Sequence, residues 1–313
     1  MRFLDEAVDL TARLSSRTPY FRGLGTLIRH FNSAVLKLGA APLTNARMQD
    51  GTVLRVDLRS HTEVYAKYLS VYDGQLIELV KGLMDSSGDF VDVGANVGFY
   101  TIALGAFLRE AGQGGQVVAF EPHEGNFHRL LENIAINKLE AVAHAHQLGL
   151  SNSEGRAELT LREDFTAGAS TGNAAIATNP EFDSRFRKIS IPLARLDDVC
   201  RHFREGGRRI SFVKVDIEGH EDFFLEGAQE ILTRARPIVL MEVNKPYYAA
   251  RGVDLDARFF PLLPGRYLVL RSVSSVWTRI KSLTECAELD NVILLPEEQI
   301  GSDKLAALVR QGP

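Results

Sequence analysis

The apolar positions of this chain change their period once, sharply, between Phe90 and Thr101. The segment reads FVDVGANVGFYT, an apolar β-branched run that stops at glycines and resumes at helical spacing. This change predicts a strand, a tight turn and a helix, with Gly94 and Gly98 supplying the permissive backbone of the turn. Asp92 closes the strand, so we expect it to face the crevice above the sheet, where open α/β folds bind ligands.

Two later apolar runs also predict strands that end in carboxylates. The run at Phe212–Gly219 contains Lys214, Asp216 and Glu218, and three charges on one side of a strand do not lie deep in a sheet that is buried on both faces. We therefore place Asp216 and Glu218 at the carboxyl end of their strand. A structural ion pair between Lys214 and Asp216 is the alternative.

The run at Pro237–Met241 ends in the same way, in Glu242 and Asn244. Carboxylates at the ends of successive strands indicate an active site, because open α/β sheets bind ligands outside those ends. Two more strands, Tyr267–Ser272 and Asn291–Leu295, are expected to complete the sheet as an antiparallel hairpin, with Trp277 in their long connection.

The first 46 residues predict a helical appendage, and residues 47–313 a single α/β domain. Apolar residues follow helical spacing at Leu27, Ile28, Phe31, Val35 and Leu36. The appendage could cap the crevice or form a dimer contact. Its basic residues also fit an interfacial membrane helix, but they are few and mixed with apolar positions, so a helix packed on the domain is favoured. These basic residues are Arg17, Arg22, Arg29 and Lys37.

Three segments connect these parts. Arg47–Leu58 predicts a hairpin that turns at Asp50 and Gly51, and Gln75–Met84 a helix that leads into the first core strand. Between Arg162 and Lys188 the composition shifts to Gly, Ala, Ser, Thr and Asn, which predicts a long loop. Long loops in compact domains are often lids or binding loops, so we expect this one to be mobile without ligand and to close over it.

The overall composition excludes several classes of protein. The chain has 313 residues, 45% of them hydrophobic, a net charge of −4 and a pI of about 6.1, so nothing indicates a nucleic-acid or anionic-membrane partner. Cys200 and Cys286 are too few and too isolated for a disulfide framework or a zinc site. The segment MRFLDEAVDLTARL carries acids inside its apolar stretch and shows no cleavage signature, and no later segment is an apolar run of membrane-spanning length, so we expect a cytoplasmic protein without membrane insertion.

The choice of cofactor depends on two residues. Glu121 follows the strand Gln116–Phe120 and lies 23 residues after Gly98, near the offset at which an acidic side chain binds ribose hydroxyls. Asn96 stands where a dinucleotide motif needs glycine for the approach of a pyrophosphate. S-adenosylmethionine keeps the adenine and ribose but carries an amino acid in place of the phosphates, so these residues favour it over NAD.

Several motifs together resemble the FkbM family of S-adenosylmethionine-dependent methyltransferases. They are DVGANVGFYT, FEP with Asn126 and Asn137, LSxxxG at Leu150, Ser151 and Gly155, the pair Leu196 and Asp197, and KVDIEGHE followed by Leu225, Glu226 and Gly227. The resemblance covers roughly Tyr65–Pro296. It implies a class I methyltransferase fold, that is, a Rossmann-like, mostly parallel, seven-stranded α/β sheet flanked by helices. It also implies methyl transfer to a hydroxyl of a sugar or natural product.

Methyl transfer to an alcohol benefits from a base that takes up the hydroxyl proton, or from a metal that acidifies the hydroxyl. The catalytic candidates are Asp216, Glu218, His220 and Glu242, although His220 fits equally well as the cap of the next helix. The carboxylates could instead bind Mg²⁺, but we favour a site without metal. The predicted cofactor-binding residues are Asp92, Gly94, Asn96, Gly98, Glu121 and Asp216.

Two other functions remain open from the sequence. A nicotinamide oxidoreductase needs backbone access for a pyrophosphate, which Asn96 disfavours, and the chain has no Tyr-x-x-x-Lys pair. A non-catalytic cofactor-binding module keeps Gly94, Gly98 and Glu121 but has no use for carboxylates on two further strands. The identity of the acceptor and the oligomeric state are not determined by the sequence.

Overall fold

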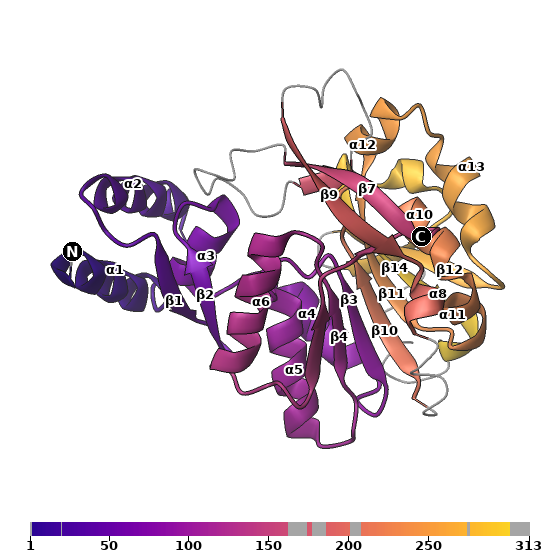
Figure 1. Cartoon of the computed structure of the whole chain (residues 1–313), viewed down its shortest axis with the longest axis horizontal. Helices are drawn as coiled ribbons and strands as arrows, with labels where there is room; N and C mark the ends of the chain where they lie inside the picture. Colours follow the sequence, from indigo (N-terminus) through magenta and orange to yellow (C-terminus); the bar gives the residue numbers. More distant parts are fainter. Residues whose placement is uncertain are drawn as a thin grey trace.

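An eight-stranded sheet forms the centre of the molecule (Figure 1). The computed structural model describes residues 2–19, 21–161, 174–176, 186–200, 208–273 and 276–300. The strand order is β13-β12-β14-β11-β10-β3-β4-β5; β11 to β5 are parallel, and β14 is antiparallel to both of its neighbours. The strands are β3 (Asp89–Val93), β4 (Val117–Phe120), β5 (Ala143–His146), β10 (Ile210–Val215), β11 (Ile238–Asn244), β12 (Tyr267–Val273), β13 (Val276–Ile280) and β14 (Leu289–Pro296).

Helices cover both faces of this sheet (Figure 1). Consecutive residues such as Phe90 and Val91, or Phe212 and Val213, enter two different hydrophobic clusters, one on each face. The first face carries α4 (Gly74–Leu83), α5 (Phe99–Ala111) and α6 (Glu124–Ile136). The second carries α8 (Leu196–Val199), α10 (Glu221–Gly227), α11 (Gln229–Arg234), α12 (Lys245–Ala250) and α13 (Leu255–Phe259). Short 3₁₀ turns lie at Phe260–Leu262, Leu283–Glu285 and Glu297–Gln299.

The direction in which strands are added reverses between β3 and β10. From β3 the chain proceeds outward through β4 to β5, and then returns to place β10 on the other side of β3. The crevice at such a reversal is the usual ligand site of an open α/β sheet. The carboxyl ends of β3 and β10 therefore position the candidate site.

The C-terminal strands confirm the predicted antiparallel pairing of β12 with β14. The sheet has eight strands, however, and not the seven expected, because β13 adds to the edge beside β12. Trp277 lies on this extra strand and not in an irregular connection. Its side chain is buried in the cluster of the first face, which explains why so short a strand joins the sheet.

A smaller sheet of order β6-β9-β7-β8 follows β5 along the chain (Figure 1). The predicted long loop at residues 162–188 lies mostly outside the described residues, and so does its expected role as a lid. The parts that are described are strands: β8 pairs with β7, and β9 begins at Arg187. The bounds are β6 (Gly149–Leu150), β7 (Gly155–Leu161), β8 (Ala174–Ile176) and β9 (Arg187–Ala194).

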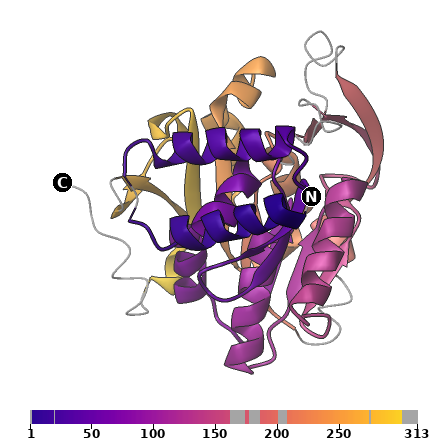
Figure 2. The ribbon, with the colours of Figure 1, turned by 90° about the vertical axis from the view of Figure 1, so that its left-hand side faces the viewer.

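The N-terminal segment is helical, as predicted, and its two helices run side by side (Figure 2). They pack with residues beyond the predicted boundary at 46, because Leu58, Val64 and Tyr68 belong to the same hydrophobic cluster. No helix within the described ranges has the length and apolar character needed to cross a membrane. The elements are α1 (Arg2–Ser15), α2 (Leu24–Lys37), the hairpin β1 (Leu43–Arg47) and β2 (Val53–Asp57), and α3 (His61–Leu69).

Polar contacts attach this segment to α6. The Asn137 side chain accepts the Val53 N–H at 2.9 Å and donates to the Val53 carbonyl oxygen at 2.6 Å. The buried Glu63 carboxylate pairs with Arg129 at 2.6 Å. Since Glu63 lies on α3 and Arg129 on α6, these contacts hold the appendage beside the helices of the first face.

Candidate active site

The turn between β3 and α5 lies directly against the end of β10. Gly94 has a φ of 77°, and a Cβ at this position would lie 2.0 Å from the Asp216 carbonyl oxygen, so only glycine fits. Asn96 also has a left-handed φ, 52°, which asparagine adopts more readily than most residues. The predicted glycine turn and the predicted active-site strand are thus in backbone contact.

Glu121 lies after β4 and connects this turn to the next one. Its carboxylate accepts the Asn96 N–H at 2.8 Å and the His123 N–H at 2.9 Å. The side chain is buried, with 5% of the residue exposed, and burial raises the pKa of Glu121 to about 7, although both N–H bonds oppose this shift. The sequence separation of 23 residues from Gly98 therefore does bring the acid to the turn.

Around these residues lies a cavity of about 230 Å³, here called the main cavity. Its polar wall is formed by Asn96, Glu121 and Asp216, which come from the ends of β3, β4 and β10. Its apolar wall includes Phe120, together with Leu150, Leu159 and Ile191 from the smaller sheet. The smaller sheet thus closes the crevice on one side.

Lys214 forms the charged centre beneath the main cavity. Its Nζ lies 3.3 Å from Asp216 and 3.8 Å from Asp92, and donates to the Gly94 carbonyl oxygen at 3.0 Å. Burial opposes the charge of Lys214, but the two carboxylates outweigh it and raise its pKa. The ion pair considered as an alternative for Lys214 and Asp216 is therefore present, and Asp216 lines the main cavity as well.

Asp92 does not face the crevice, contrary to our expectation. Its side chain is fully buried, accepts the Thr101 hydroxyl at 2.6 Å and is absent from the lining of the main cavity. Burial raises the pKa of Asp92, and Lys214 opposes that shift. Asp92 therefore pairs with Lys214 from inside the protein and does not lie on the surface of the cavity.

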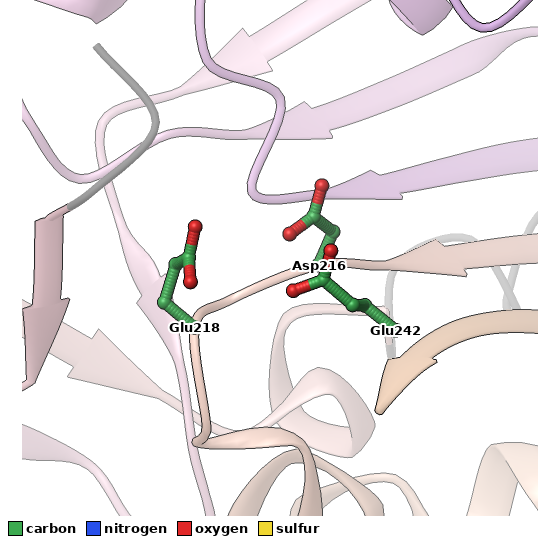
Figure 3. A group of neighbouring side chains, drawn as sticks. All are labelled: Asp216, Glu218 and Glu242. Atoms are coloured by element: carbon green, nitrogen blue, oxygen red, sulfur yellow. The ribbon is translucent and has the colours of Figure 1, made fainter. Parts of the chain in front are cut away.

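Three carboxylates converge at the ends of β10 and β11 (Figure 3). One oxygen each of Asp216, Glu218 and Glu242 lies within 4.8 Å of the others. Burial, followed by repulsion from Asp216 and Glu218, raises the pKa of Glu242 to about 9. This group can therefore share a proton, and its oxygens are also of the kind that Mg²⁺ prefers.

A buried carboxylate shapes the loop that carries Glu218. Glu221 accepts the N–H groups of Ile217 and Gly219 at 3.1 and 3.2 Å, and also the hydroxyl of Tyr248. These bonds hold Glu218 at a left-handed φ of 55°, an uncommon conformation that side chains adopt where surrounding structure enforces it. No feature of the sequence separates the supporting role of Glu221 from the roles of Asp216, Glu218 and His220.

His220 lines the main cavity as a neutral side chain. Its Nε2 lies 2.9 Å from the Ser151 hydroxyl, and burial lowers the pKa of His220 to about 4. It occupies the N-cap position of α10, as the alternative expected, but its side chain forms no capping hydrogen bond there. The alternative that His220 caps the helix is thus not borne out by its side chain, and a base with so low a pKa is weak at neutral pH.

Two tyrosines, which sequence reasoning missed, form the boundary of the site. Tyr72 stacks on Phe99 with ring centroids 3.9 Å apart, and the Tyr100 hydroxyl donates to Asp73 at 3.2 Å. Tyr72 precedes a helix in a segment without motif or charge pattern, so no sequence signal marked it. Tyr100 belongs to the glycine-turn motif, but the motif predicts only that it lies in the following helix.

A second cavity of about 330 Å³, here called the side cavity, adjoins the main one. Its wall is polar and includes Asp73 and Asn291. Both cavities are lined by Thr62, Tyr72, Tyr100, Lys214, Asp216 and Glu242. The carboxylate group therefore lies where two compartments meet, one over the glycine turn and one beyond it.

This strand order, with an antiparallel strand inserted next to β11 and a cavity at the switch point, defines a class I methyltransferase fold. The family described as Methyltransferase FkbM domain matches residues 92–266, which is more than half of the chain. The chain therefore belongs to the FkbM methyltransferase family, a family of S-adenosylmethionine-dependent enzymes.

Similar proteins were found by sequence and by structure. "Methyltransferase sdnD" of Sordaria araneosa is 28% identical over 171 residues, which are 47% of this chain and 62% of that protein. The chain thus spans less than two thirds of this relative. FkbM methyltransferase from Methylobacillus flagellatus has a TM-score of 0.41 at 16% identity, covering 74% of this chain and 52% of that one. The O-methyltransferase TomG from Streptomyces achromogenes, in complex with SAM, has a TM-score of 0.41 at 13% identity, covering 93% and 98%.

Proposed function

We propose that this protein transfers the methyl group of S-adenosylmethionine to a hydroxyl group of a sugar, glycoside or natural product. The observation that carries the proposal is that the main and side cavities meet at Asp216 and Glu242. A donor in one compartment and an acceptor in the other would face each other across these carboxylates. Holding two reactants in line is the main contribution that an enzyme makes to such a transfer.

The residues of the main cavity fit this cofactor. Glu121 keeps acceptor capacity for ribose hydroxyls beyond its two N–H bonds, since a carboxylate has about four lone-pair sites. Asn96 lines the same cavity, and its Oδ1 is buried without a hydrogen-bond partner in the described parts of the chain. An ammonium donor, such as that of the methionine moiety, would satisfy this oxygen. The apolar wall with Phe120 and Leu150 suits the adenine.

The chemistry of the transfer requires one proton to leave the acceptor. S-adenosylmethionine supplies an electrophilic methyl group with a good leaving group already attached. We assign uptake of the hydroxyl proton to the group of Asp216, Glu218 and Glu242, because its mutual repulsion makes one member a stronger base than an ordinary carboxylate. His220 is the weaker candidate, since its pKa is lowered to about 4.

The polar side cavity favours an acceptor rich in hydroxyl groups. Asp73 and Asn291 line it together with Thr62, and their oxygens and amide group can pair with several hydroxyls of one molecule. The stacked ring of Tyr72 adds an apolar surface of the kind that packs against a sugar ring. This combination supports a sugar or glycoside more than a purely apolar acceptor.

The test has two parts. Calorimetric titration should give binding of S-adenosylmethionine and S-adenosylhomocysteine, and none of NAD, which separates methyl transfer from a nicotinamide-dependent function. The protein is then incubated with S-adenosylmethionine and pools of glycosides and natural products, and products heavier by one methylene are sought by mass spectrometry. Products found with wild type but not with Asp216→Asn support the proposal. Cofactor binding with no methylated product from any hydroxyl-bearing pool would contradict it and favour a non-catalytic module.

A further inference from the structure

Apart from Leu289, at 58%, the most exposed large apolar side chains of the described structure lie on or directly after the N-terminal helices. Phe3 is 79% exposed, Leu38 71%, Leu14 62%, Leu27 60% and Leu10 58%. The two helices, α1 and α2, run beside each other across one side of the molecule (Figure 2). Single exposed apolar residues need no explanation, but a group of this size does.

Each helix has two apolar stripes, of which only one is used in the fold. Val8 and Ala12 of α1, and Ile28 and Val35 of α2, are buried in the hydrophobic cluster that joins the helices to α3. The second stripes follow helical spacing along the chain and face away from that cluster. They consist of Phe3, Ala7, Leu10 and Leu14 on α1, and of Leu27 and Ala34 on α2 with Leu38 directly after it. Phe31, between the two stripes of α2, packs against the inner cluster.

The charge of this segment differs in sign from that of the rest of the chain. Residues 1–40 hold six Lys and Arg against three Asp and Glu, a net charge of +3, whereas the whole chain carries −4, so residues 41–313 carry −7. Asp5 accepts the Ala41 N–H at 3.0 Å, and Asp9 pairs with Lys67 at 2.6 Å. Arg13 and Arg17 beside the α1 stripe are exposed.

We propose that this outer face, formed by the second stripes with Arg13, Arg17, Arg22 and Lys37, binds the surface of an anionic lipid membrane. The helices would lie in the plane of the interface, with leucines and Phe3 among the upper acyl chains and the basic groups among anionic headgroups. A second copy of the chain is the less suitable occupant, because it would bring the same positive charges against these. The positive charge of this face therefore favours an anionic membrane over a second copy of the chain.

The experiment measures binding of the full chain to vesicles by co-sedimentation. Vesicles of phosphatidylcholine alone are compared with vesicles that also contain phosphatidylglycerol. We expect at least tenfold stronger partitioning to the anionic vesicles, reduced by added salt. The double variants Leu10→Asp/Leu14→Asp and Arg13→Glu/Arg17→Glu should each lose about tenfold or more. Leu131→Asp, on the exposed side of α6 and 41% exposed, is the matched control and should bind like wild type.

Two measurements keep the result interpretable. All variants should bind S-adenosylhomocysteine like wild type, which shows that a loss of vesicle binding is not a loss of folding. Sedimentation equilibrium is run on the same proteins. Equal partitioning of wild type and both double variants overturns the proposal, as does a wild-type dimer that Leu10→Asp/Leu14→Asp dissociates while no vesicle is bound.

Discussion

Removal of the Glu121 carboxylate should both weaken cofactor binding and destabilise the fold, and the two effects can be measured separately. Glu121→Ala leaves the N–H groups of Asn96 and His123 without their acceptor. Each such buried group costs about 1–3 kcal/mol. Because water can reach the cavity and bind part of what is exposed, the free energy of unfolding should fall by about 2–4 kcal/mol in total. Loss of a charge-assisted hydrogen bond to ribose, about 1.5–3 kcal/mol, should weaken S-adenosylhomocysteine binding by roughly 10- to 150-fold.

Urea denaturation measures the first quantity and calorimetric titration the second. Glu124→Ala is the matched control: this neighbouring acid is 76% exposed and outside the main cavity, so affinity should not change. Because the pKa of Glu121 is raised to about 7, wild-type affinity should increase from pH 6 to pH 8 as the carboxylate ionises, and Glu121→Gln should remove this dependence. Wild-type affinity in a folded Glu121→Ala protein would refute the ribose assignment.

Three other variants test the rest of the site. Asp216→Asn should lower turnover by about 10²–10⁴-fold with S-adenosylhomocysteine affinity retained. Loss of wild-type turnover on addition of EDTA would indicate that the carboxylates bind a metal and do not act as a base. If Asp216→Asn and Glu242→Gln both turn over like wild type, His220 is the next candidate. The pKa of Glu242, raised to about 9, predicts that wild-type turnover increases with pH through the neutral range, and that Glu242→Gln flattens this profile. Gly94→Ala should cost about 3 kcal/mol or more of unfolding free energy, because its Cβ meets the Asp216 carbonyl oxygen. Gly112→Ala, at a similar φ of 64° with open space around it, should cost only about 1–2 kcal/mol, and equal losses would show that the close contact is unimportant.

The sequence predicted the strands and the main turn because their signals are local. Glycines, β-branched residues and terminal carboxylates along a few neighbouring positions define β3, β4, β10 and β11, and the strand ends then bring Glu121, Asp216 and Glu242 together. The prediction for Asp92 failed because alternation along a strand gives two faces but not the depth of a side chain. Lys214, on the neighbouring strand, decides that depth by pairing with it.

Contacts between distant segments were not predictable in the same way. Tyr72 enters the site from the segment before α4, and only the packed fold brings it onto Phe99. The smaller sheet depends on pairing of β7 with β9 across a segment of low periodicity, so composition there suggested a loop. For the N-terminal helices the sequence pattern predicts packing on the domain. This is correct for one stripe of each helix, but the pattern says nothing about what the exposed stripe contacts.

The contact of Gly94 with the Asp216 carbonyl oxygen has a consequence for how this scaffold can diversify. Main chain touches main chain there, so the separation between the glycine turn and the end of β10 is set without any side-chain rotamer. In the proposed function, new acceptors would be accommodated by exchanging residues such as Thr62 or Asn291 on the far wall of the side cavity, while the distance between the donor and acceptor compartments stays constant. A library that varies that far wall and leaves the glycine turn untouched is therefore the economical way to alter which molecule is methylated.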